Sequence, residues 1–406
     1  MRILHTSDWH LGQHFMGRTR QAEHRAWCDW LVQTVVEQQA DALIIAGDIF
    51  DTGTPPSYAR EQYNRFITQM HDTGCQLVIL AGNHDSVSML NESKDLLARL
   101  NTQVISSVAD SHTEQVLVLK QRNGQVGAIV CAIPYIRPRD VQRSQAGQSG
   151  DEKQRDLQQA IAEHYAQLFA QAQAVRAELG LALPIIGTGH LTTVGVSLTE
   201  SVREIYVGTL TAFPTDAFPA FDYLALGHIH RPQKVAGLEH IRYSGSPIAL
   251  SFDEGRQQKE LLCVDLNAQG LETVTVLDIP CFQRLISLSG SLDELKQQFA
   301  ELAQELDEGA VAWLEIQVRG DDYYKDLEAR VTELCADWPV EVLRVRRLRG
   351  TQVAGLSAES GEVLAELTPD EVFAKRLHGE ELSDDDISVL QGLHAQVLAS
   401  LQEAEQ

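Results

Sequence analysis

Apolar runs of strand length, each ending in a polar side chain, constrain the fold of this chain more than any other feature of its sequence. Runs this short are typical of buried strands, and the stretches between several of them repeat apolar residues at helical spacing. Buried strands with intervening helices predict a layered α/β core. The runs are at 3–4, 42–45, 77–80, 127–133, 184–186 and 223–226, helices are expected at 20–39, 57–70 and 153–179, and a surface loop is expected at 137–156.

Two shorter patterns follow this core, so we expect three domains, at 1–275, 281–350 and 366–406. Between 281 and 350 strand and helix patterns alternate, and Ser291 and Glu294 form a capping box that begins a helix. This segment is predicted to be a small α+β unit. The last segment holds two short helices with too few apolar residues for a core of their own. They must therefore dock, either back onto the same chain or onto a partner.

Composition limits the location and the partners of the chain. No apolar run is long enough to cross a bilayer. The six cysteines are scattered without a CxxC pair, which suits reduced thiols, so we expect a cytoplasmic protein. The formal net charge of −24 opposes free-standing binding to nucleic acid, because phosphate contact normally needs a basic face. Bound cations or a basic partner would offset this charge.

The polar side chains at the strand ends are of the kinds that bind metal ions. In an open α/β sheet, ligands bind at the carboxyl ends of the strands. A glycine precedes four of the five motifs, which allows a sharp turn and a close approach of the backbone. The motifs are Ser7-Asp8-Trp9-His10, Gly47-Asp48-Ile49-Phe50-Asp51, Gly82-Asn83-His84-Asp85, Gly189-His190 and Gly227-His228-Ile229-His230.

Together these motifs predict a site for two divalent cations. Carboxylates, an amide oxygen and imidazoles form a mixed nitrogen and oxygen donor set suited to Mn, Fe or Zn. Asp48 is the natural candidate for a carboxylate that bridges the two ions. Two ions about 3.5–4 Å apart can hold a hydroxide and flank a phosphorus atom for in-line displacement. The residues therefore indicate a hydrolase of phosphate esters.

The ordered motifs DxH, GDxxD, GNHD, GH and GHxH resemble those of the calcineurin-like metallophosphoesterase superfamily, over roughly the first 250 residues. The segments IPYIRP (133–138), GHIHRP (227–232) and YSGSP (243–247) are similar to a narrower family, the bacterial DNA nuclease subunits that act with an SMC-like ATPase. The resemblance implies a β-sandwich flanked by helices for the core. It also implies that 281–350 is a cap that positions DNA.

By this resemblance each matching side chain takes a role. His84 would contact the scissile phosphate and act as a general acid, and Asp85 would orient His84. Archaeal relatives have a histidine where this chain has Asp51, so Asp51 is expected to support the ligands rather than act on the substrate. The cations would be Mn²⁺, with Mg²⁺ as a substitute. Asp8, His10, Asp48 and His230 would hold one ion, and the other would be held by Asp48, Asn83, His190 and His228.

The resemblance also implies an activity and partners. The substrate would be DNA, cut in single strands and hairpins by an endonuclease activity and from duplex ends by an ATP-dependent 3′→5′ exonuclease activity. A coiled-coil SMC-like ATPase would bind 366–406, in a heterotetramer built on a homodimer of the nuclease chain. The complex would act in DNA repair, recombination and replication at the nucleoid. A dense basic cluster either meets phosphate or is an ordinary charged surface; it consists of Arg344, Arg346, Arg347 and Arg349.

Two other functions are alternatives. A hydrolase of phosphoproteins would carry GDxVDRG at the second motif, but Thr52 stands in place of the arginine, and a small-molecule hydrolase would leave 276–406 without a role. A catalytically inactive scaffold would lack ligands, yet each expected ligand is present. Trp9 and Phe50 are expected to pack in the core. The histidines expected to be structural or exposed are His5, His14, His24, His71, His112, His164, His240, His378 and His394.

Overall fold

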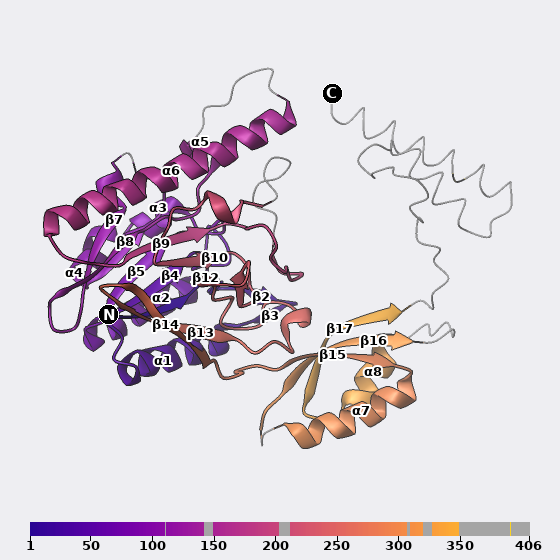
Figure 1. Cartoon of the computed structure of the whole chain (residues 1–406). Helices are drawn as coiled ribbons and strands as arrows, with labels where there is room; N and C mark the ends of the chain where they lie inside the picture. The colour runs from indigo at the N-terminus through magenta and orange to yellow at the C-terminus, as the bar shows by residue number, and fades with distance from the viewer. Residues whose placement is uncertain are drawn as a thin grey trace. The chain divides into compact units, whose positions relative to one another are not determined.

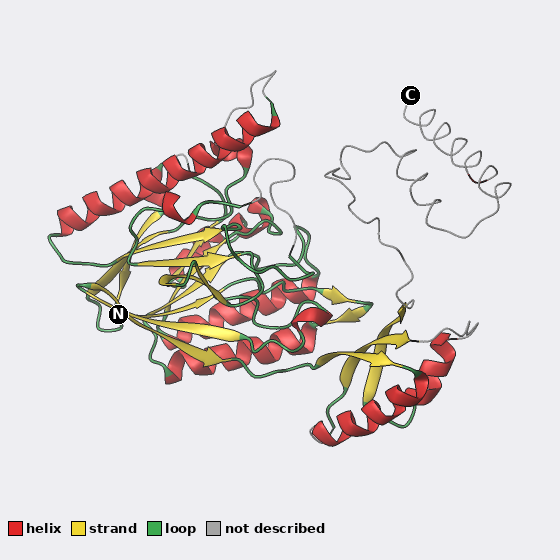
Figure 2. Ribbon diagram, turned by 45° about the vertical axis from the view of Figure 1, so that its right-hand side comes forward, coloured by secondary structure: helices red, strands yellow, loops and turns green. Residues whose placement is uncertain are grey.

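The computed structural model describes residues 1–109, 111–141, 149–202, 212–306, 309–319 and 327–348, together with Leu390. Its core consists of two six-stranded sheets with helices on their outer faces (Figures 1 and 2). The predicted α/β class and the β-sandwich flanked by helices are therefore confirmed. The helices expected at 366–406 and the basic residue Arg349 lie outside the described residues.

The first sheet is mainly parallel. Strand β1 pairs in parallel with β4, β4 with β5, and β5 with β6, whereas β13 and β14 add an antiparallel hairpin at the other edge. The order across the sheet is β14 (Gly270–Asp278), β13 (Glu260–Asn267), β1 (Arg2–Thr6), β4 (Ala42–Ala46), β5 (Gln76–Leu80) and β6 (Thr102–Ile105).

The second sheet has a parallel centre and antiparallel edges. Strands β8, β9, β10 and β12 run in parallel, while β7 and β11 pair antiparallel with their neighbours. The order is β11 (Gln233–Val235), β12 (Leu238–Tyr243), β10 (Tyr223–Gly227), β9 (Ile185–His190), β8 (Val126–Cys131) and β7 (Val116–Lys120). A small separate hairpin is formed by β2 (His14–Phe15) and β3 (Arg18–Thr19).

Helices cover the outer face of each sheet, with α1 and α2 on the first and α6 on the second (Figure 1). The helices expected at 20–39, 57–70 and 153–179 correspond to these three. The helices of the core are α1 (Gln21–Glu37), α2 (Ser57–Thr73), α3 (Val87–Asn91), α4 (Lys94–Arg99), α5 (Pro138–Val141) and α6 (Gly150–Leu179), with short 3₁₀ turns η1 (His112–Glu114), η2 (Thr215–Ala217) and η3 (Phe252–Glu254).

Both faces of the central strands are buried, which explains why these strands are continuously apolar. In β4, Ala42, Ile44 and Ala46 belong to the core between the two sheets. Leu43 and Ile45 point the opposite way, into the core that includes side chains of α1 and α2. On the second sheet, α6 covers the outer face in the same manner. The site-bearing strand ends are therefore held from both sides by packed side chains.

The chain divides into two compact units. Among the described residues, the first comprises those within 1–287, 305–315 and 339–344, and the second comprises those within 288–304, 316–338 and 345–348. A three-stranded sheet has the order β15 (Leu285–Gly290), β16 (Ala312–Arg319) and β17 (Val340–Leu348), and the helices of this region are α7 (Leu292–Glu305) and α8 (Leu327–Cys335). The predicted capping box at the start of α7 is confirmed, because Ser291 and Glu294 exchange hydrogen bonds.

The surface loop predicted at 137–156 is wrong at both ends, because a helix lies at each of them. The segment 137–156 contains α5, and α6 already begins at Gly150. Ser149 caps α6 by accepting from the Glu152 backbone N–H at 3.3 Å, and the Glu152 carboxylate accepts from the Ser149 N–H at 2.9 Å. This cap starts the helix within a polar stretch that has no apolar period. In the described part of the chain, no helix combines the length and the apolar character needed to span a membrane.

Candidate metal centre

The predicted site lies where strands of both sheets end. The loops after β1, β4 and β5 come from the first sheet, and those after β9 and β10 come from the second. Hydrogen bonds join these loops: Asp8 N donates to Gly47 O at 3.0 Å, and His228 N donates to Asp8 Oδ1 at 2.9 Å. The imidazole of His190 reaches across between the sheets, where its Nδ1 donates to Ala46 O at 2.9 Å. Five segments that are distant in sequence therefore form one cluster.

The backbone at this cluster is strained. Asp8, His10, Asp48 and His228 have positive φ angles of 56°, 49°, 49° and 92°. Such angles are uncommon for residues other than glycine and cost on the order of 1–3 kcal/mol each in sparsely populated regions. Packed strands on either side hold these residues in place. Strain of this kind is concentrated at functional sites, because it aims side chains that a relaxed strand would direct elsewhere.

Two glycines make room for the functional side chains. A Cβ on Gly47, which has a φ of 95°, would lie 2.1 Å from His190 Nδ1. A Cβ on Gly82 would lie 2.1 Å from Asp48 Oδ1. Any larger residue at either position would displace one of these two side chains. Close approach thus requires glycine at both positions, and the positive φ of Gly47 requires it there as well.

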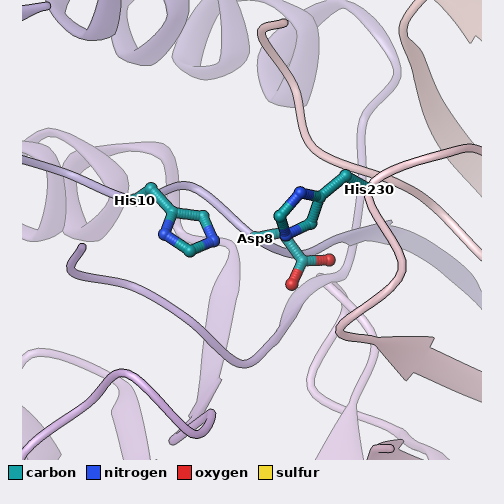
Figure 3. Close-up of side chains that lie close together, drawn as sticks. All are labelled: Asp8, His10 and His230. Atoms are coloured by element: carbon teal, nitrogen blue, oxygen red, sulfur yellow. The ribbon is translucent and has the colours of Figure 1, made fainter. Parts of the chain in front are cut away.

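Asp8, His10 and His230 form the first group of candidate ligands. They are 0%, 2% and 3% exposed, and one ligand atom from each lies within 4.8 Å of the others. Figure 3 shows the three side chains close together. Asp8 also accepts from Ser7 Oγ at 2.5 Å, and His230 Nδ1 contacts Ser201 Oγ at 2.6 Å. These contacts hold the side chains of Asp8 and His230 in one orientation.

Asp48, His190 and His228 form the second group, and Asn83 joins it. Ligand atoms of the first three lie within 4.8 Å of one another. Asn83 Oδ1 lies 2.9 Å from His190 Nε2 and 3.2 Å from His228 Nδ1. The amide oxygen of Asn83 is therefore directed at the same point as the two imidazoles. All seven residues predicted as ligands lie in these two groups.

Asp48 lies between the two groups. Its Oδ2 is 3.2 Å from His190 Nε2 and 3.7 Å from His10 Nε2. Its Oδ1 accepts from the backbone N–H of His84 at 2.8 Å. Burial alone would favour the neutral acid, but the His190 imidazole next to it holds the pKa of Asp48 well below its usual range. Asp48 is therefore a carboxylate placed to serve both groups.

The donor atoms present fit divalent cations. His10 Nε2 and His228 Nε2 are buried and have no hydrogen-bond partner among the described residues. Nδ1 of His190 donates to a carbonyl, so Nε2 is the ring nitrogen that faces the oxygens of Asp48 and Asn83. Burial lowers the pKa of His190, but the Asp48 carboxylate outweighs it and raises this pKa to about 9. A cluster of lone pairs that attracts positive charge is what a metal site provides.

His84 lies beside both groups and is half-buried, as Asn83 is, whereas the other six ligands are buried. Its ring centroid is 4.7 Å from that of His10, and its Nδ1 is 2.7 Å from Asp51 O. Because a carbonyl can only accept, Nδ1 carries the proton in this arrangement. Asp51 also contacts His10, with 3.1 Å between Asp51 Oδ1 and His10 Nδ1. Asp51 therefore supports two histidines, one through its backbone and one through its carboxylate.

The carboxylate of Asp85 binds backbone groups of two loops that supply ligands. Its carboxylate accepts three backbone N–H groups, from Gly82 at 2.8 Å, Ile49 at 3.1 Å and Phe50 at 3.0 Å. Burial and the nearby Asp48 raise the pKa of Asp85 to about 6. These bonds use the carboxylate to join the loop after β4 to the loop after β5. The Asp51 carbonyl contacts Nδ1 of His84 and helps to orient its ring.

A buried ion pair behind His230 was missed by the sequence reasoning. Lys259 Nζ donates to Glu254 Oε2 at 2.7 Å and to His230 O at 3.2 Å. The other oxygen of Glu254 accepts from Ser201, whose hydroxyl contacts His230 Nδ1. The pair thus holds His230 by its backbone and by its ring. The only signal was the YSGSP segment, whose Ser246 accepts from Lys259 at 2.9 Å.

Residues predicted to have no functional role behave as expected where the structure describes them. Trp9 and Phe50 are fully buried, and Trp9 packs edge-on against Trp27 with ring centroids 5.7 Å apart. His5 contacts Tyr223 OH at 2.9 Å and His24 contacts Trp9 O at 2.9 Å. Burial lowers the pKa of each of these two imidazoles to about 3, so both are neutral core residues.

The comparison with known families agrees with this geometry. Residues 1–232 match the calcineurin-like phosphoesterase family, which is more than half of the chain. Residues 281–381 match a second family, described as the type 5 capsule protein repressor C-terminal domain. The chain belongs to the calcineurin-like phosphoesterase family.

Its relatives are named as components of a nuclease. The SbcD component of the nuclease SbcCD from Escherichia coli strain K12 is 48% identical over 401 residues, covering 99% of this chain and 98% of that protein. Proteins of the same name from Rhodobacter capsulatus and Bacillus subtilis are 35% and 32% identical, covering 63% and 79% of this chain and 64% and 80% of theirs. A β-glucosidase from Exiguobacterium marinum aligns with a TM-score of 0.22 and 9% identity, which is too low to carry an argument.

Proposed function

We propose that the chain is a two-metal phosphodiesterase that hydrolyses the backbone of DNA. The observation that carries this proposal is the position of Asp48, whose Oδ2 lies between imidazoles of the two ligand groups. A carboxylate in this position is suited to bridge two cations. The choice of DNA as substrate is supported by the relatives, which are named nucleases and are similar over most of the chain.

The two ligand groups would hold one cation each and share Asp48. The mixed nitrogen and oxygen donor set suits Mn²⁺, and Mg²⁺ is a substitute with a weaker preference for imidazole. When bound, the ions would polarise the phosphoryl oxygens and supply an activated water for in-line attack. One ion would be held by Asp8, His10, Asp48 and His230, and the other by Asp48, Asn83, His190 and His228.

His84 would supply the proton that the leaving oxygen needs. Its Nδ1 is fixed by Asp51 O, so the ring cannot rotate freely and Nε2 is the atom that exchanges a proton with the substrate. Its partial exposure leaves His84 accessible to a phosphate, unlike the buried histidine ligands. A positioned general acid contributes roughly 10²–10⁴-fold to the rate. Asp85 assists indirectly, because it holds the loop that carries His84.

We further propose the activity and the assembly that the resemblance implies. Single strands and hairpins would be cut by the endonuclease activity, and duplex ends by a 3′→5′ exonuclease activity that depends on ATP. An SbcC-type coiled-coil ATPase would bind residues 366–406, in a heterotetramer that contains a homodimer of this chain. Residues 281–350 would form the cap over DNA. The basic surface of such a partner would offset the net charge of −24.

The test uses the purified chain, circular single-stranded DNA and Mn²⁺. We expect nicking that EDTA abolishes. His84→Ala should lose most turnover but keep the thermal stabilisation by Mn²⁺, whereas Asp48→Ala should lose that stabilisation as well. Retention of full activity by His84→Ala would rule out its role as the acid. Deletion of 368–406 should preserve cleavage but end association with the ATPase, and continued co-purification would refute the docking site.

A further inference from the structure

The segment 133–138, which reads IPYIRP, runs beside the candidate metal centre. It follows β8, and the backbone N–H of Ile133 donates to Thr188 Oγ1 at 2.6 Å. Two residues later, Tyr135 N donates to Ala81 O at 2.8 Å. Ala81 precedes the motif that carries Asn83, and Thr188 precedes His190 by two residues. The segment is therefore attached to two of the loops that supply ligands.

Tyr135 and Arg137 continue outward from the ligand His190. The Tyr135 ring is edge-on to the His190 ring, with centroids 6.4 Å apart, and Tyr135 is 8% exposed. The Arg137 guanidinium lies over the Tyr135 ring, with Cζ 5.7 Å from its centroid. Arg137 Nη2 also donates to Asp85 O at 3.3 Å, next in sequence to His84. The Arg137 guanidinium thus lies over the Tyr135 ring, which contacts the ligand His190. It also lies beside Asp85, the residue that follows His84.

The charge of Arg137 is not balanced by an ion pair within the described residues. Its neighbour Arg139 does form one, with 3.8 Å between Arg139 Nε and Asp140 Oδ1, although the Arg139 side chain is 80% exposed. The contact of Asp140 with Arg137 is to the backbone: Asp140 Oδ2 accepts from the Arg137 N–H at 3.2 Å. A guanidinium has five N–H donors, and one carbonyl uses only part of this capacity. In a chain with a net charge of −24, a half-buried cation that has no carboxylate partner among the described residues suits an anionic ligand.

We propose that Arg137 binds the DNA phosphate next to the scissile one and that Tyr135 holds its guanidinium in place. The inference deepens the proposed nuclease function and rests on it. The Tyr135 ring separates Arg137 from the ligand His190, so the guanidinium is placed for a neighbouring phosphate rather than for the phosphorus that is attacked. Planar guanidinium groups bind phosphate through two parallel hydrogen bonds and stack on aromatic rings, which lysine cannot reproduce.

A structural role for Arg137 makes different predictions. If Arg137 served only to hold the loop of His84 through Asp85 O, its loss would disturb the acid and the ligands together. Every phosphodiester would then be hydrolysed more slowly, including one with a single phosphate. If Arg137 binds a flanking phosphate, only a substrate with more than one phosphate loses a contact. The two roles are separated by comparing such substrates.

The experiment measures kcat/KM in Mn²⁺ for a single-stranded oligonucleotide and for bis(4-nitrophenyl) phosphate, which has one phosphate. Arg137→Met should lower kcat/KM on the oligonucleotide on the order of tenfold more than on the small diester, mainly through KM. The slope of log(kcat/KM) against log[salt] should become shallower by about 0.7, the value for one phosphate contact to a single strand. Arg137→Lys should restore the slope but only part of the affinity. Arg139→Met removes the same charge two residues away and should match the parent chain.

Equal losses on both substrates would overturn the inference, and so would a slope unchanged in Arg137→Met. A thermal unfolding measurement with Mn²⁺ shows whether Arg137→Met still folds and binds metal. If Arg137→Met does not fold, Arg137→Lys provides a second test. Failure of the proposed function gives a separate result. In that case the parent chain would hydrolyse bis(4-nitrophenyl) phosphate but no DNA, whatever residue stands at 137.

Discussion

The buried ion pair of Lys259 and Glu254 gives the prediction with the best-defined magnitude. Lys259→Met removes the cation and leaves a carboxylate that is 0% exposed. Removing one partner of a buried pair costs about 3–5 kcal/mol in free energy of unfolding, because the other charge stays buried without compensation. Glu254 keeps five donors: Ser201 Oγ, Thr199 Oγ1 at 2.9 Å, Leu250 N at 3.0 Å, Ser251 Oγ at 3.2 Å and Ser246 Oγ at 3.3 Å. We therefore expect a loss of unfolding free energy at the lower end of this range, about 3 kcal/mol.

This loss is measured by urea unfolding in EDTA, with tryptophan fluorescence as the signal. A cost of about 3 kcal/mol corresponds to a fall in Tm of roughly 6–12 °C for a domain of this size. Lys234→Met is the matched control, since Lys234 pairs with Glu239 at the surface and should change the free energy by less than about 1 kcal/mol. The double variant Glu254→Gln with Lys259→Met should recover part of the loss. If Lys259→Met were as mild as the control, the reasoning about this pair would be wrong.

Three further predictions concern the site and its surroundings. Asp51→Asn weakens the contact to His10 Nδ1 and should lower Mn²⁺ affinity by about 10–100-fold in calorimetry, whereas unchanged affinity would argue against a supporting role. Gly47→Ala places a Cβ 2.1 Å from His190 Nδ1 and should abolish stabilisation by Mn²⁺ in thermal unfolding; a normal Mn²⁺ response would contradict the close approach. Burial lowers the pKa of His5 from 6.5 to about 3 in the folded chain. Between these pH values the unfolded chain binds a proton at His5 that the folded chain does not bind. The stability from this group is therefore lost as the pH falls from 6.5 toward 3. His5→Gln should reduce the slope of unfolding free energy against pH by about 1.4 kcal/mol per unit in EDTA between these values, and an unchanged slope would show that His5 is protonated in the folded chain.

The candidate ligands were predictable because each one ends a strand or lies within about four residues of its end. Parallel strands bring their carboxyl ends to one edge, so Asp8, Asp48 and Asn83 had to meet once β1, β4 and β5 paired. The addition of His190 and His228 depends on a second sheet, and apolar periodicity does not reveal how strands divide between sheets. In β4 both faces are buried, so the alternation that would identify the facing layer is absent.

Contacts between distant segments account for what the sequence reasoning missed. Glu254 and Lys259 lie outside the strand-end motifs, and their importance appears only when η3 and β13 are folded next to His230. The resemblance gave Asp85 the role of orienting its neighbour His84, but its carboxylate turns toward the backbone of Ile49 and Phe50. Adjacency in sequence predicts which loop a residue belongs to. It does not predict which way the side chain points.

Diffraction at the manganese absorption edge, from a crystal of this chain soaked in Mn²⁺, tests the two-ion site most directly. We expect two anomalous peaks about 3.5–4 Å apart, with the carboxylate of Asp48 in contact with both. His10 and His230 should lie at one peak, and Asn83 and His190 at the other. A single peak, or two peaks that do not share Asp48, would contradict a shared two-ion site and the phosphodiester chemistry derived from it.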